Sequence, residues 1–160
     1  MDKIIDERVE KVFKSSDPFS DKRGRIDNYS LPYPVNMANI ITTIKPNDNY
    51  PMRANHYHPE QTQMCLVISG SYISVHKDLA IPDAPVRSHL VRTGDLVLTP
   101  PMVAHTMIFL DDTTFINLVG GNRDHNKFNK EHTITYNLVP ETDIMRYLEM
   151  HKEEIAQLKK

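Results

Sequence analysis

From residue 35 onward, the hydrophobic residues of the chain occur in short runs that Pro, Gly, Asn or Asp interrupt. The runs are rich in β-branched and aromatic side chains, which is typical of β-strands joined by turns. We predict eight strands: Met37–Ile44, Met52–His58, Thr62–Ser69, Tyr72–Lys77, His89–Val91, Asp95–Thr99, Ala104–Leu110 and Thr114–Val119. Eight short strands within about 80 residues favour an all-β jelly-roll or barrel.

The residues before this region are more polar, and their first part is compatible with two structures. Four hydrophobic residues there have the spacing of a short helix, but an edge strand would use the same residues: Ile5, Val9, Val12 and Phe13. The polar stretch Ser15–Ser30 contains an Asp-Pro and an Arg-Gly turn signal, so we predict a loop. Residues 1–34 are therefore expected to form an N-terminal arm and a lead-in loop.

The C-terminal part of the chain predicts one more strand and a helix. The strand covers Thr133–Val139 and ends at Pro140, and Thr142 can cap the helix that follows. Four hydrophobic side chains fall on one face of this helix: Ile144, Leu148, Ile155 and Leu158. This face can dock on the barrel of the same chain or form a dimer contact. The predicted organisation is a single domain, with a barrel over 35–140 and a C-terminal helix over 141–160.

The composition excludes several classes of protein. The chain of 160 residues fits one domain, because two useful cores would each need about 100 residues. With 39% hydrophobic and 25% charged residues and a net charge of −2, it is neither disordered nor a strongly basic nucleic-acid binder. No apolar run reaches the ~18 residues of a membrane span, and the N-terminus lacks the apolar core of a signal peptide. We therefore expect a cytoplasmic protein.

The unusual feature is the eight histidines. His56 and His58 are separated by one residue of a predicted strand, so both point to the same face. On the inner face of a barrel, such a pair is either a metal site or a costly burial of two titratable rings. Gln63 on the next strand can face the pair, and His105 at the start of a later strand supplies a fourth donor. We expect the other histidines at the surface: His76, His89, His125, His132 and His151.

Two segments, HYHPEQTQMCLVISG from His56 and GDLVLTPPMVAH ending at His105, resemble the two motifs of the cupin superfamily. The resemblance implies a cupin (jelly-roll-like) β-barrel that binds a divalent metal through His56, His58, Gln63 and His105. Gln63 replaces the usual glutamate, which removes a negative charge and should weaken or alter metal binding. Three histidines and an amide suit Zn²⁺, although Fe(II), Mn or Ni would accept the same donors. Alternatively, cupins that have lost the metal keep such histidines as hydrogen-bonded core groups.

Two shorter segments resemble the nucleotide-sugar epimerase cupins, the group that includes dTDP-4-keto-6-deoxyglucose 3,5-epimerase. FSDKRG, which contains Arg23, is similar to their Asp-x-Arg-Gly element. RANHYH, which begins at Arg53, is similar to the Arg-Gly-Asn-His-Tyr-His element of a bifunctional capsular-polysaccharide epimerase, with Ala54 in place of glycine. The resemblance implies that both arginines contact the substrate. A planar guanidinium at Arg53 suits a diphosphate, and the alternative for Arg53 is a surface salt bridge.

The chemistry of that family is proton transfer next to a ketone. A 4-keto group acidifies the hydrogens on C3 and C5, a base removes one of them, and a metal can stabilise the enolate oxygen. In the metal-free epimerases the base is the histidine that corresponds to His56. A nitrogen bound to metal has no free lone pair, so in a metal site Tyr136 and Glu60 become the candidate proton carriers.

The resemblance therefore predicts a metal-dependent isomerase or epimerase that acts on a nucleotide-linked 4-keto sugar in surface polysaccharide biosynthesis. A homodimer is the expected assembly, and neither nucleic acid nor membrane is an expected partner. Two other functions stay open. One is a different metal-cupin enzyme, either a sugar-phosphate isomerase or an iron(II) oxygenase, and the other is a non-catalytic sugar-binding cupin.

Overall fold

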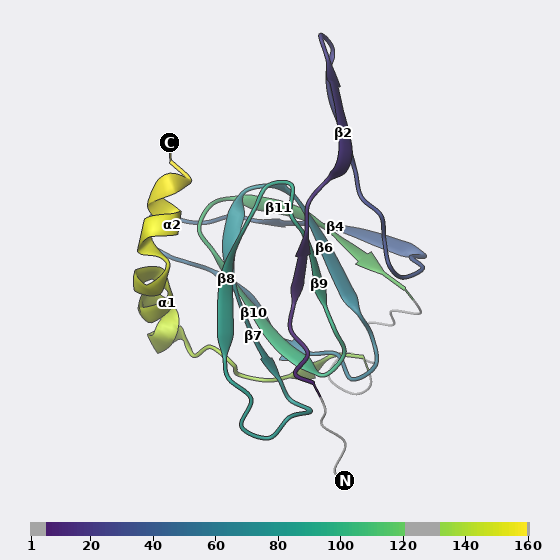
Figure 1. The fold of residues 1–160 in the computed structure, drawn as a ribbon. Coiled ribbons are helices and arrows are strands. Elements are labelled where there is room, and N and C mark those ends of the chain that lie inside the picture. The colour runs from purple at the N-terminus through teal and green to yellow at the C-terminus, as the bar shows by residue number, and fades with distance from the viewer. Residues whose placement is uncertain (1–5, 121–131, 160) are drawn as a thin grey trace.

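The computed structural model describes residues 6–120 and 132–159, and these residues form two five-stranded sheets that face each other (Figure 1). One sheet has the strand order β1-β9-β6-β11-β4 and the other the order β12-β5-β10-β7-β8. No ladder joins the two sheets within the described ranges, so the jelly-roll is a sandwich and not a closed barrel. The prediction of an all-β, jelly-roll-like cupin fold with a C-terminal helix is confirmed.

All eight strands predicted between residues 35 and 120 are present, with ends that differ by one or two residues. They are β4 (Met37–Thr43), β5 (Met52–Tyr57), β6 (Gln63–Ser69), β7 (Ser71–Asp78), β8 (Arg87–Arg92), β9 (Leu96–Thr99), β10 (Val103–Phe109) and β11 (Thr113–Val119). Each pairs antiparallel with its neighbours. The agreement follows from the short β-branched and aromatic runs and from the turn residues between them, which are local features of the sequence.

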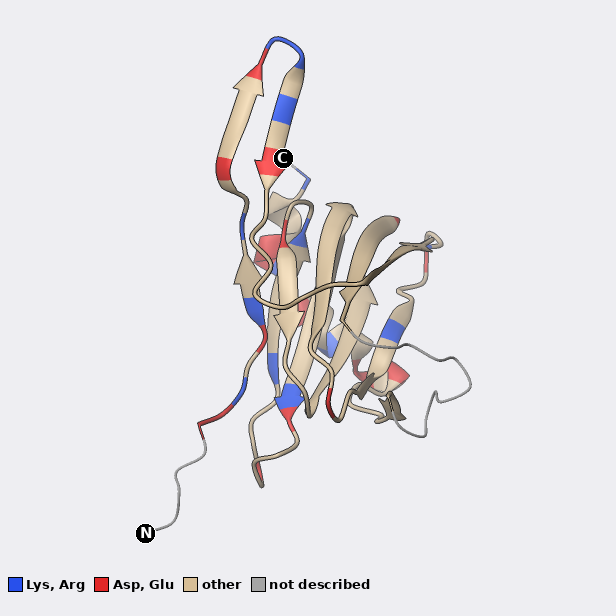
Figure 2. Ribbon diagram, turned by 90° about the vertical axis from the view of Figure 1, so that its right-hand side faces the viewer, with Lys and Arg blue, Asp and Glu red and all other residues tan. Residues whose placement is uncertain are grey.

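The N-terminal part is more ordered than the sequence indicates. Of the two structures considered for the first residues, the edge strand is found: β1 (Lys11–Phe13) pairs with β9. The prediction of a loop over Ser15–Ser30 is wrong, because β2 (Ser16–Asp21) and β3 (Gly24–Asn28) form a hairpin. This hairpin projects from the sandwich (Figures 1 and 2) and carries basic residues at its tip.

The C-terminal part is less regular than predicted. The late strand is only β12 (Ile134–Thr135), and a 3-10 turn, η2 (Glu141–Asp143), precedes two short helices, α1 (Ile144–Met150) and α2 (Lys152–Gln157). Thr142 lies inside η2 and does not cap the helix, since Asp143 occupies the N-cap position of α1 without a side-chain hydrogen bond. No helix among the described residues is long and apolar enough to cross a membrane.

The helices dock on the outer face of the second sheet, as one of the two predicted arrangements requires. Their inward side chains pack against a buried cluster that includes Ile73, Val75 and Ile108: Ile144, Leu148, Ile155 and Leu158. A second cluster, which includes Tyr72, Phe109 and Phe115, fills the space between the sheets. Cys65 belongs to this inner cluster and is a buried thiol.

The space between the sheets changes from apolar to polar along the strands. On β10, Phe109 and Met107 belong to the apolar inner cluster, and two residues further on the inward position is His105. The opposite sheet changes in the same way, from Cys65 to Gln63 on β6. The polar end of the sandwich is therefore where the candidate site must lie.

Candidate functional site

Three histidines meet at the polar end of the sandwich. His56 on β5 lies directly opposite His105 on β10, and His58 immediately follows β5. One ligand atom from each ring lies within 4.8 Å of the others. The ring centroids of His56 are 4.8 Å from His58 and 4.7 Å from His105. The structure thus brings together three of the four predicted metal ligands in a largely buried position.

Gln63 reaches the histidines from the opposite sheet. Its amide nitrogen donates to Asn117 Oδ1 at 3.2 Å, which directs Gln63 Oε1 at His58 Nε2, 3.0 Å away. His58 Nδ1 donates to the backbone carbonyl of His132 at 2.8 Å, so a neutral His58 ring has its lone pair on Nε2. Two acceptors then face each other. A proton on His58 Nε2, rotation of the Gln63 and Asn117 amides, or a cation held by both atoms removes this conflict.

His105 presents a lone pair to the same point. Its Nδ1 donates to the Val103 carbonyl at 3.2 Å, and its Nε2 is buried without a hydrogen-bond partner in the described part of the chain. Burial lowers the pKa of His105 below its usual value, although the charge of Glu10 and the Val103 carbonyl act in the opposite direction. A neutral imidazole of this kind is a metal ligand or a base. The donor set of three imidazoles and one amide oxygen therefore fits a divalent metal such as Zn²⁺.

A second group of polar residues lies beside this site, and we did not predict it from the sequence. His76 on β7 is paired with His105, is only 3% exposed and lies close to the carboxylate of Glu10. The prediction that His76 lies at the surface is therefore wrong. Burial opposes the ionisation of Glu10, but the interactions with His76 and His89 outweigh it and lower the pKa of Glu10 to about 2.

A signal for this group was present in the sequence of β7. The inward positions of this strand are Tyr72, Ser74, His76 and Asp78, and all four are buried. Polar residues that alternate with apolar residues along a strand can point inward as well as outward. We predicted that His76 points outward, and this prediction is wrong. His151 is also buried, because it lies between Ser88 of β8 and Glu154 of α2, at 2.8 Å from each. His125 lies outside the described residues.

Arg53 lies on the same strand as His56, near the edge of the sandwich. Its guanidinium donates to Thr43 Oγ1 and to the carbonyl of Thr42, both on the opposite sheet. Within the described residues Arg53 makes no ion pair, so the alternative of a surface salt bridge is not observed. The side chain is exposed, and its charge is available to an anionic ligand.

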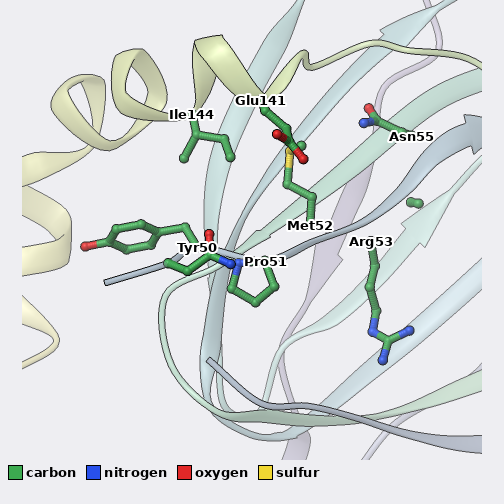
Figure 3. Close-up of a pocket in the computed structure, with 9 residues that line it drawn as sticks. Tyr50, Pro51, Met52, Arg53, Asn55, Glu141 and Ile144 are labelled. Atoms are coloured by element: carbon green, nitrogen blue, oxygen red, sulfur yellow. The ribbon is translucent and has the colours of Figure 1, made fainter. Parts of the chain in front are cut away.

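Arg53 also borders a groove of about 510 Å³ between β5 and the start of α1. The lining residues are Asn49, Tyr50, Pro51, Met52, Arg53, Ala54, Asn55, Glu141 and Ile144. In Figure 3 the guanidinium of Arg53 extends away from Glu141 and Ile144. The side chain of Asn55 forms hydrogen bonds with the backbone of Val139, which lies on the outer face of the second sheet. Most of this groove therefore lies on the outer face of β5, and the histidines lie on its inner face.

The other predicted site residues are not brought to the three histidines. Arg23 lies at the turn of the β2–β3 hairpin and is paired with Asp21 at 2.6 Å. Glu60 is exposed in the loop that follows His58. The ring of Tyr136 lies 6.4 Å from that of Tyr57, which by strand alternation faces away from the histidines. The roles of these three residues stay predictions.

The fold occurs in solved structures of nucleotide-sugar enzymes. A sugar 3,4-ketoisomerase of Thermoanaerobacterium thermosaccharolyticum in complex with TDP is 17% identical, with a TM-score of 0.63 over 91% of this chain and 96% of that one. A mutant of that enzyme in complex with TDP-4-keto-6-deoxyglucose is 18% identical, with a TM-score of 0.60 over 73% and 83% of the two chains. The dTDP-4-dehydrorhamnose 3,5-epimerase of Sulfolobus tokodaii is 19% identical, with a TM-score of 0.61 over 80% and 79%.

No protein-family model and no curated protein matches the chain. At these identities the structural likeness concerns the fold and not the activity. The arrangement of two facing sheets is thus the cupin-like fold that sugar-nucleotide 3,4-ketoisomerases and 3,5-epimerases share.

Proposed function

We propose that the chain is an isomerase or epimerase of a nucleotide-linked 4-keto sugar. The observation that carries this proposal is the convergence of His56, His58 and His105 in a buried, polar end of the sandwich, with Arg53 exposed on the same strand as His56. Imidazoles can move protons near neutral pH, and a guanidinium binds phosphate oxygens. The similar solved structures add support, because two of them contain TDP or a TDP-linked 4-keto sugar.

The proposed reaction begins with removal of a proton next to the C4 ketone. The negative charge that develops on the ketone oxygen needs a donor or a cation in a site that excludes water. The buried histidines provide such surroundings, and the neutral state of His105 leaves a lone pair for the proton or for a metal. Return of the proton to C3 or C5 on the other face gives an epimer. Delivery of the C3 proton to C4 instead, with transfer of the C3 hydroxyl proton to the C4 oxygen, gives the 3-keto isomer.

We also propose that His56, His58, Gln63 and His105 bind a divalent metal, with Zn²⁺ the preferred ion. Such an ion would stabilise the enolate oxygen as a Lewis acid. The facing acceptors of His58 and Gln63 support this assignment. With the histidine nitrogens bound to the metal, another group has to carry the proton. Glu60 and Tyr136 stay the sequence predictions for this role, and the structure does not bring either of them to the histidines. The polysaccharide pathway, the cytoplasmic location and the homodimer remain predictions from the sequence.

Proton exchange tests the reaction directly. In D₂O, TDP-4-keto-6-deoxyglucose should incorporate deuterium at C3 or C5 in the presence of the protein, as followed by NMR. His58→Ala should slow the exchange by about 100-fold or more, because it removes one of the converging imidazoles. His151→Ala is the matched control, since His151 is also a buried histidine but lies under the C-terminal helices. No exchange in a panel of nucleotide-linked 4-keto sugars would refute the proposed function.

The metal is tested separately by elemental analysis. His58→Ala should lower the metal content by one ion per chain while circular dichroism shows an intact fold. Exchange that survives complete removal of metal by a chelator would contradict the metal proposal without contradicting the isomerase. Proton transfer would then fall to the histidines themselves. Oxygen consumption by the iron-loaded protein, without proton exchange, would instead indicate the oxygenase.

A further inference from the structure

Glu10, His76 and His89 form a second buried cluster that the proposed reaction does not use. They come from three parts of the fold: the residue before β1, the inner face of β7 and the inner face of β8. One ligand atom from each lies within 4.8 Å of the others. Glu10 and His76 are 9% and 3% exposed, and the side chain of His89 is 27% exposed. Two imidazoles and one carboxylate are a common ligand set for divalent transition metals.

The distances in this cluster suit coordination better than hydrogen bonding. His76 Nδ1 and His89 Nε2 both lie 3.4 Å from Glu10 Oε2. A charge-assisted hydrogen bond between an imidazole and a carboxylate is normally about 2.7–2.9 Å long. Two donor atoms bound to one Zn²⁺ at the tetrahedral angle are about 3.4 Å apart. Neither nitrogen makes a hydrogen bond to any described residue.

The carboxylate is held in place by its own partners. Ser74 Oγ donates to Glu10 Oε2 at 2.6 Å, and Thr99 Oγ1 donates to Glu10 Oε1 at 2.9 Å. Hydrogen bonds of this kind orient the ligands of metal sites. Among the described residues, Glu10 has no lysine or arginine as a side-chain partner, so a buried negative charge faces two imidazoles and two hydroxyls. A bound cation would compensate this charge.

One contact has to change when a metal binds. The backbone N–H of Glu10 points to His76 Nε2 at 3.4 Å, the long limit of a hydrogen bond. If His76 Nε2 accepts this bond, a neutral His76 carries its proton on Nδ1, which faces Glu10 Oε2. Hydrogen bonds then hold the cluster without a metal. If a metal occupies Nδ1, the proton moves to Nε2 and this contact is lost. A metal-binding measurement therefore distinguishes the hydrogen-bonded state of the cluster from the metal-bound state.

We propose that Glu10, His76 and His89 bind a second divalent transition-metal ion, separate from the three-histidine site. The ion links the segment before β1 to β7 and β8, so its binding fastens the N-terminal segment to the sandwich. The proposal does not depend on the reaction that the protein catalyses.

The test uses the full chain with the first site removed. The double variant His56→Gln/His58→Gln, stripped of metal by a chelator, is titrated with Co²⁺ and followed by visible absorption and by elemental analysis after dialysis. It should bind one ion per chain. Adding Glu10→Gln, which keeps the shape of the side chain, should weaken Co²⁺ binding by about tenfold or more. Adding His151→Gln instead should leave binding unchanged, because His151 belongs to neither cluster.

A second substitution keeps the test interpretable if Glu10→Gln, at a buried position, does not fold. His89 is partly exposed, and His89→Gln should also weaken Co²⁺ binding while circular dichroism shows a folded protein. Metal should raise the thermal midpoint of the double variant but not of the proteins that also carry Glu10→Gln or His89→Gln. If the double variant binds no metal, or if both added substitutions leave binding unchanged, the cluster is held by hydrogen bonds alone and the proposal is overturned.

Discussion

At the scale of single residues, the backbone at Ala54 and Asn55 explains how β5 places its functional side chains. Both residues have a positive φ, 70° and 52°, and the register between β5 and β10 shifts by one residue at this point. The extra residue puts Arg53 and His56 on the same inner face and sends Asn55 outward, where Val139 and Thr106 bond to its side chain. This bulge therefore couples the candidate phosphate-binding arginine to the histidines.

Ala54→Gly should stabilise the protein. The left-handed conformation costs a residue with a Cβ roughly 1–2 kcal/mol, and glycine largely avoids this cost. We expect the free energy of unfolding in urea to rise by about 1 kcal/mol. Ala38→Gly in β4, whose φ is not positive, is the control and should lower it by roughly 0.5–1 kcal/mol. Equal losses in both variants would show that the bulge at Ala54 is unstrained in solution.

The same residues show what the sequence could and could not predict about the site. His56 and His58 were placed on one face because a strand alternates, and Gln63 and His105 followed from the spacing of the two cupin-like motifs. Glu10 could not be found in this way. It meets Ser74 and Thr99, which are 64 and 89 residues away, and only the pairing of β1 with β9 brings them together. Local patterns contain no information on such a pairing.

At the scale of elements, the segment before β1 is attached to the sandwich mainly by charged groups. Asp78 at the end of β7 is buried and accepts hydrogen bonds from the backbone and guanidinium of Arg8, at 2.8 Å and 2.9 Å. Arg87 on β8 pairs with Glu7 at 2.6 Å. Burial opposes ionisation of Asp78, but the bonds from Arg8 and Ala80 outweigh it and lower the pKa of Asp78 below its usual value.

This lowered pKa predicts a dependence of stability on pH. The folded-state pKa lies below the unfolded value of about 3.9, so the contribution is present above that pH and is lost as the pH falls through the folded value. Asp78→Asn should lower the free energy of unfolding by about 2 kcal/mol at pH 6. The difference between wild type and variant should shrink at pH 3, as measured in urea. A difference that is the same at both pH values would contradict this account.

The elements also differ in how well they could be predicted. The strands β4 to β11 are recognisable because most are short runs of β-branched or aromatic residues that turn residues separate. The hairpin β2–β3 was missed because Ser16–Asp21 and Gly24–Asn28 are mostly polar and every residue in them is exposed. The helix at the C-terminus was predicted from its apolar face, but its interruption at His151 was not. That residue turns inward to Ser88, a contact that only the tertiary structure supplies.

At the scale of the whole molecule, the projecting hairpin is the feature that the fold of one chain does not explain. Phe19 and Ile26 lie opposite each other across β2 and β3, and they are 53% and 57% exposed. Figures 1 and 2 show the hairpin extending beyond both sheets, and within residues 6–120 and 132–159 its two apolar side chains stay largely exposed. Large apolar side chains in such a position are typical of protein interfaces.

The homodimer predicted from the sequence would cover this pair, and substitution of the pair tests it. Burial of two such side chains contributes about 1.5–3 kcal/mol each, so Phe19→Ser/Ile26→Thr should raise the dissociation constant on the order of 100-fold or more. Light scattering coupled to size-exclusion chromatography should show a dimer for the wild type and a monomer for the variant at the same concentration. Met145→Ser is the control, because Met145 is 67% exposed and belongs to α1, which Figure 1 shows at the left of the sandwich and away from the projecting hairpin. A monomeric wild type, or a variant that remains dimeric, would show that the hairpin is not the dimer contact.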